Sequence, residues 1–162
     1  MPLRNGAEWT YEVNGRLRNS VEEVRVTGHT SVDGQPGFVL SGALGSSRLA
    51  WKGTKLVASE LSGIGYSPAI TIVDFSGNNP NWSGEIRAYG VTTKASDSIV
   101  QKNTTFTLSG RKYSAVECSH TLKFGTNTIE TKITFVQGLG IVALDEHRDG
   151  QFLGSIRYLA GP

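Results

Sequence analysis

Cys118 and His120 are the residues whose types and spacing come closest to nucleophilic catalysis. On a strand, residues two apart share a face and lie about 6.5–7 Å apart along the chain. The same face carries Val116, Leu122 and Phe124, and free cysteine is commonly buried and inert. We therefore interpret Cys118 as a packed, hydrophobe-like thiol, and expect His120 to be hydrogen-bonded or near a barrel mouth.

Other patterns for catalysis and metal binding are weaker still. A serine nucleophile needs a sharp turn, a base and an orienting group, and no Gly-x-Ser-x-Gly segment is present. Zinc needs three or four convergent ligands, whereas His29, His120 and His147 are far apart in the sequence. The cluster Asp145-Glu146-His147 is more typical of a solvated strand end. The sequence thus predicts no catalytic residue, no metal ligand and no cofactor.

Paired carboxylates are the remaining catalytic possibility. Glycoside hydrolysis needs two of them facing each other across a cleft. Glu117 and Glu130 instead fall on the predicted outer face, with Lys123 and Lys132, where cross-strand ion pairs explain them better. We therefore predict that the domain is not an enzyme. The alternative is a barrel-type hydrolase or isomerase, which would need two or more titratable groups converging in a pocket.

Aromatic side chains are the best candidates for binding. Trp82 lies in the polar segment 76–83, where a large apolar ring has no local reason to be. It either caps an open end of a barrel or forms a wall or lid for an apolar ligand. The candidate ligand-binding residues are Trp82, Tyr66, Trp51 and His120.

The elements that must position these residues are strands. Apolar and polar residues alternate in most of the chain, most clearly over 116–124 and 129–135, and no apolar stripe with a 3.6-residue period is sustained. We expect segments 62–68 and 76–83 to be loops. The fold class is all-β: an antiparallel meander of about ten to twelve strands, forming a β-sandwich, a half-barrel or a small barrel.

Composition sets further bounds. The 162 residues suit one β domain, which we place at 1–162. The net charge is +2 without any basic cluster, so nucleic acid is not an expected partner. No apolar stretch approaches eighteen residues, so we predict a soluble domain without a transmembrane segment. Cys118 is the one cysteine, which excludes an internal disulfide.

Several short segments also resemble a known family, the bacterial envelope β-domains of the DUF3108 and TapB-like type. The matching segments are Pro2-Leu3 with Gly6, Trp9 and Tyr11, then Trp82-Ser83-Gly84, Gly110 to Val116, and Phe135 to Val142. Val136-Gln137 departs from the usual Ala-Pro, and Ile141 from the usual Leu. The resemblance implies a β-sandwich or unclosed barrel that is periplasmic or anchored at the outer membrane as a lipoprotein. The resemblance assigns no catalytic residue to this chain.

Two binding hypotheses follow. The first is a non-enzymatic cell-envelope domain with a binding or scaffolding role, whose partner is an envelope protein or an apolar small molecule. The alternative is a calycin-like or lipoprotein-carrier-like binder of a lipid or another apolar molecule. That alternative predicts an enclosed apolar cavity of about 300–1,000 Å³.

Overall fold

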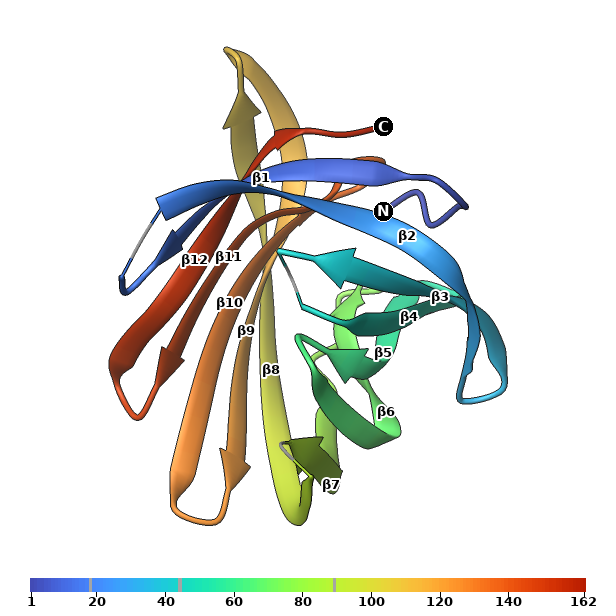
Figure 1. Ribbon diagram of the computed structural model, residues 1–162, viewed down its shortest axis with the longest axis vertical. Helices are drawn as coiled ribbons and strands as arrows, with labels where there is room; N and C mark the ends of the chain where they lie inside the picture. Colours follow the sequence, from blue (N-terminus) through green and yellow to red (C-terminus); the bar gives the residue numbers. More distant parts are fainter. Residues whose placement is uncertain (18, 44, 89) are drawn as a thin grey trace.

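The computed structural model describes residues 1–17, 19–43, 45–88 and 90–162, and in this part of the chain it consists of twelve antiparallel strands. Each strand pairs with the next along the chain, and β1 also pairs with β12, so the meander closes into a barrel (Figure 1). The strands are β1 (Glu8–Gly15), β2 (Asn19–Val32), β3 (Gln35–Gly42), β4 (Ser47–Lys52), β5 (Lys55–Leu61), β6 (Ile64–Asp74), β7 (Asn81–Ala88), β8 (Val91–Leu108), β9 (Arg111–Phe124), β10 (Asn127–Val136), β11 (Gly140–Arg148) and β12 (Gln151–Ala160).

The all-β prediction is confirmed, and among the predicted shapes the structure is the small barrel. The unclosed barrel implied by the family resemblance is wrong, because β1 and β12 pair from Thr10↔Ala160 to Gly15↔Gly154. Closure satisfies the backbone groups that both terminal strands would otherwise expose. No helix able to cross a membrane occurs among the described residues.

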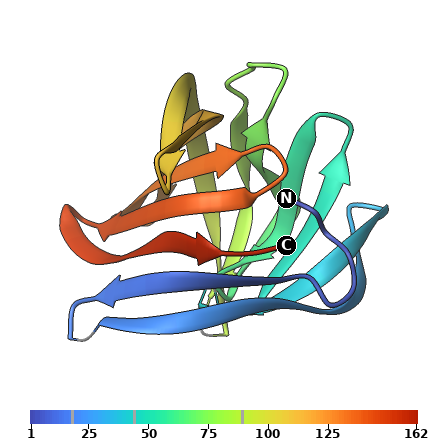
Figure 2. The same cartoon turned by 90° about the horizontal axis from the view of Figure 1, so that it is seen from above.

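The barrel has two unlike ends. We call one end the mouth. It contains the connections β5–β6, β7–β8, β9–β10 and β11–β12. We call the opposite end the base. Both chain ends lie close together at the base in the two views (Figures 1 and 2).

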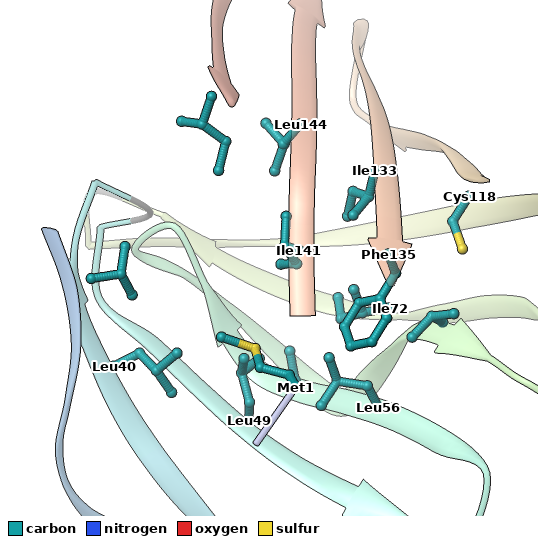
Figure 3. Close-up of a cluster of buried hydrophobic side chains, with 14 of the residues drawn as sticks. Met1, Leu40, Leu49, Leu56, Ile72, Cys118, Ile133, Phe135, Ile141 and Leu144 are labelled. Atoms are coloured by element: carbon teal, nitrogen blue, oxygen red, sulfur yellow. The ribbon is translucent and has the colours of Figure 1, made fainter. Parts of the chain in front are cut away.

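The main hydrophobic core occupies the base and extends into the mouth half of the barrel. Figure 3 shows Leu49 of β4 and Phe135 of β10 near Met1, which reaches this cluster from the N-terminal segment. Trp9 and Tyr11 are fully buried, and their polar atoms donate hydrogen bonds to the carbonyls of Leu139 (2.8 Å) and Ile141 (2.9 Å). Each such buried side chain contributes roughly 1.5–3 kcal/mol of stability.

The predicted loop 62–68 is wrong, and the predicted loop 76–83 is confirmed only for 76–80, which matters for the site. The segment 62–68 lies mostly in β6, and β7 begins at Asn81, so Tyr66 and Trp82 are strand residues. The pairing of β6 with β7 covers only Gly65↔Arg87, Tyr66↔Ile86 and Ser67↔Glu85. It ends at Pro68, which has no N–H to donate.

Side chains continue the closure of the barrel beyond Pro68. The indole Nε1 of Trp82 donates to the Pro68 carbonyl (3.0 Å), and a ring nitrogen of His120 lies 3.0 Å from the Ile72 carbonyl. The Gln101 side chain accepts from the Asp74 amide (2.8 Å) and donates to the Asp74 carbonyl (3.2 Å). We call this set of contacts along the free edge of β6 the seam.

Candidate functional site

Two adjoining spaces lie in the mouth half of the barrel. The deeper one, the inner chamber, has a volume of about 30 Å³ and is lined by four titratable side chains: Tyr66, Asp97, His120 and Glu146. Its other walls are mostly aliphatic, from β5, β6, β9 and β10. A space of this size holds about two water-sized groups.

The outer space, the mouth cavity, has a volume of about 460 Å³. Its apolar walls include Ile64, Ile86, Val91, Phe124, Ile129 and Leu153. Ser62, Ile64, Ile129 and Glu146 line both spaces, so the two adjoin, with Glu146 at their boundary. Val91 is 66% exposed, which shows that the mouth cavity opens to solvent.

A buried dyad of Asp97 and His120 forms one wall of the inner chamber. The Nδ1 atom of His120 lies 2.8 Å from Asp97 Oδ2, and Nε2 lies 3.0 Å from the Ile72 carbonyl. A carbonyl only accepts, so Nε2 carries a proton, and a second proton must lie between Nδ1 and Asp97. Both ring nitrogens of His120 are therefore engaged within the protein.

The other oxygen of Asp97 has no hydrogen-bond partner in the described part of the chain. The Asp97 side chain is 0% exposed, yet Oδ1 accepts no hydrogen bond from any described residue. Buried polar atoms are nearly always paired in native proteins. The inner chamber thus contains a buried acceptor that the described protein groups do not satisfy.

Glu146 and Tyr66 add to this polar surface. Burial raises the pKa of Glu146, and no basic side chain among the described residues forms an ion pair with it. Burial, and then the charges of Asp97 and Glu146, raise the pKa of Tyr66 as well. At neutral pH, Tyr66 is therefore a neutral phenol that can both donate and accept.

Trp82 contacts the site through the ring of Tyr66. Its ring packs edge-on against Tyr66, with ring centroids 5.7 Å apart. Trp82 lines neither the inner chamber nor the mouth cavity, but borders a polar groove on the outer surface with Asn81, Ser83 and Ser96. Its structural role is to hold Tyr66 and bridge the seam.

Trp51 lies apart from the other predicted binding residues. Its ring contacts Phe75 and Phe135, each with centroids 6.1 Å away, and its Nε1 donates to the Met1 carbonyl (3.2 Å). These partners belong to the base. The structure thus brings Tyr66, His120 and Trp82 together and leaves Trp51 at the opposite end.

Two residues of the site escaped the sequence predictions. Asp97 follows the inward phase of Ala95 and Ile99, and Glu146 follows that of Val142 and Leu144. The interpretation of Glu146 as part of a solvated strand end was wrong, because this inward phase carries it into the barrel. Asp97 and Glu146 are each charged residues at a position where the alternation of the strand predicts an inward, apolar side chain. That pattern would have identified them from the sequence.

Cys118 occupies the place expected for it. The thiol is fully buried, and burial, followed by the charge of Glu117, raises its pKa to about 12. Its sulfur lies 3.2 Å from Gln101 Oε1. No three His, Cys, Asp or Glu side chains of the described residues converge in a metal-binding arrangement.

Comparison with known proteins places the fold but not the family. No family model matches the chain, and no curated protein matches it. A "putative lipoprotein" from Parabacteroides distasonis has the same fold, with a TM-score of 0.59 and 9% identity over 100% of this chain and 97% of that one. A "putative exported protein with YmcC-like fold" from Bacteroides fragilis aligns with a TM-score of 0.60 and 10% identity over 100% and 98%. At such identities the likeness shows the fold alone, and the resemblance to the DUF3108 and TapB-like family stays a prediction.

Proposed function

We propose that this chain is a non-enzymatic cell-envelope β-barrel domain that binds a small, largely apolar molecule in its mouth cavity. The observation that carries the proposal is the mouth cavity itself, whose volume of about 460 Å³ lies within the usual range for small-molecule sites. Its apolar walls and the few polar groups of the adjoining inner chamber are the composition typical of such sites.

The shape of the site differs from the enclosed cavity that a calycin-like carrier predicts. The inner chamber is about 30 Å³, far below the predicted volume, and the larger space is open at the mouth. At the base, Trp51, Phe75 and Phe135 pack against one another and border a separate groove of about 360 Å³. A ligand would therefore enter at the mouth and remain partly exposed to solvent.

Two lines of support favour the cell envelope. The structural neighbours are named as a "putative lipoprotein" and a "putative exported protein". Short segments of this chain also resemble envelope β-domains. A periplasmic or outer-membrane-anchored location follows from this proposal. Fractionation of cells that express the full reading frame tests it, and recovery of the protein in the cytoplasm would overturn the location.

An enzymatic role is the second candidate, because Tyr66, Asp97, His120 and Glu146 converge on one chamber. The hydrogen bonds of His120 count against it. A general base needs a free nitrogen within reach of its substrate, whereas Nδ1 and Nε2 both contact protein acceptors. This arrangement supports a structural dyad.

Titration with the neutral fluorescent probe N-phenyl-1-naphthylamine tests ligand binding. We expect saturable binding that weakens at least about ten-fold in Thr93→Trp, because the indole would occupy part of the mouth cavity. Val100→Trp is the matched control, since Val100 lies on the same strand but is 62% exposed and lines neither space. No saturable binding, or equal loss in both variants, would refute the proposal.

A further inference from the structure

The inner chamber is lined by a residue with an unsatisfied acceptor. Asp97 Oδ1 is buried and lacks a partner among the described residues, although Tyr66 and Thr131 line the same chamber. His120 cannot serve this atom, because its two ring nitrogens already contact Asp97 Oδ2 and the Ile72 carbonyl. A group with protons to donate would complete the chamber.

Glu146 places a second carboxylate at the entrance to the chamber. Its position depends on β11, whose register with β12 shifts between Glu146 and His147. The extra residue at this bulge is Leu153 of β12, which also lines the mouth cavity, and Glu146 keeps the inward alternation of β11. The nearest cation on the inward phase of β11 is Arg148, which donates to Asn127 Oδ1 (2.9 Å) and pairs with Asp149 (3.8 Å). The rim arginine is thus held by its own neighbours and does not neutralise the carboxylate.

The size of the chamber limits what can bind there. About 30 Å³ admits a head group no larger than about two water molecules. A primary ammonium meets this limit and supplies three donors, whereas a trimethylammonium or a sugar is too large. A carboxylate head would face Asp97 and Glu146 and would have no proton to donate to Asp97 Oδ1, which would disfavour its binding.

We propose that the ligand is a primary alkylamine or a similar amphipath, whose compact ammonium head binds Asp97 and Glu146 while its tail fills the mouth cavity. This inference rests on the proposed function, because it needs the mouth cavity to hold an apolar tail. Charge and hydrogen bonding then select the head, and the apolar walls select the tail.

Displacement of the bound neutral probe by three matched chains tests this selection. We expect octylammonium to bind at least about ten-fold more tightly than octanoate, and more tightly than octanol. Octyltrimethylammonium should lose most of this advantage, because its head is too large for the inner chamber and has no N–H. Absence of saturable probe binding refutes the proposed function, whereas failure of every chain to displace a bound probe refutes the inferred ligand class alone. Equal displacement by all three matched chains refutes only the assignment of the head group.

Variants of the two carboxylates locate the head. Glu146→Gln should reduce the preference for octylammonium over octanol by at least about five-fold, because the amide carries no charge to attract the ammonium. Asp97→Asn should act in the same direction, and a thermal melt of each variant shows whether it is folded. Glu130→Gln is the control, because Glu130 is exposed on β10 and lines neither space. An unchanged preference in folded Glu146→Gln would overturn the inference.

Discussion

At the scale of single residues, Trp82 and Gly84 depend on each other. The two residues are two positions apart on β7 and therefore face the same side of the strand. The Trp82 indole lies next to Gly84. A Cβ atom at Gly84 would lie 2.3 Å from the Ser67 carbonyl oxygen and 2.8 Å from the Trp82 ring. The Trp-Ser-Gly segment is therefore a packing unit that seats the ring against Tyr66.

Gly84→Ala tests this packing. We expect a loss of about 1–3 kcal/mol in the free energy of unfolding, because backbone at Ser67 cannot move aside easily. Gly28→Ala is the control, since Gly28 is also a strand glycine but has no atom within 4 Å of the added Cβ. Urea denaturation of both variants measures the difference. Equal stability of Gly84→Ala and the wild type would contradict this account of Trp82.

Single residues also show what strand alternation can reveal. The inward face of Cys118 and His120, and that of Ile129, Ile133 and Phe135, were predictable because period two is a local property of the chain. The outward position of Glu117 was predictable for the same reason, and it pairs with Lys102 and Lys132, each at 2.9 Å. The partners of His120 were not predictable, because Asp97 and Ile72 lie on other strands.

At the scale of elements, the seam is the unusual feature of the barrel. Main-chain pairing between β6 and β7 stops at Pro68, and side chains of Trp82, His120 and Gln101 bond to the free edge of β6. Side chains hold an edge less uniformly than a continuous ladder of backbone hydrogen bonds. We expect this part of the barrel to open locally at lower free energy than the rest.

Gln101→Ala tests the seam directly. The substitution removes the bonds of Gln101 to the amide and carbonyl of Asp74 and to the Asn78 carbonyl. We expect the amide of Asp74 to exchange with deuterium at least about ten-fold faster, while the central amides of β10 keep their protection. Lys102→Ala is the control, because Lys102 is the exposed neighbour on the same strand. Unchanged exchange at Asp74 would show that Gln101 does not hold the seam.

At the scale of the whole molecule, the site has a cost in stability. Burial raises the pKa of Glu146 above its ordinary value of 4.5, which means that its ionised form is disfavoured in the folded protein. The stability associated with this group is present below that ordinary value and is lost as the pH rises through the folded-state pKa. A buried carboxylate that lowers the stability of the folded protein when it ionises is typical of a binding site.

Glu146→Gln should therefore stabilise the protein at neutral pH. The amide has no charge to desolvate, so the melting temperature should exceed that of the wild type at pH 7 and equal it at a pH below 4.5. Thermal melts across this range measure the effect, and Glu130→Gln is again the matched control. A constant difference between Glu146→Gln and the wild type at all pH values would show that desolvation of the carboxylate is not its cause.

The sequence by itself determined the strands, the antiparallel meander and the inward or outward phase of most strand residues, because these follow from local alternation and short turns. It could not determine that segments 62–68 and 76–83 contain strand residues, since their polar, glycine-rich composition is typical of loops. Only the tertiary structure decided that β1 pairs with β12 and that Tyr66, Asp97, His120 and Glu146 meet. Those four residues come from β6, β8, β9 and β11, and their distances depend on register and closure around the whole barrel.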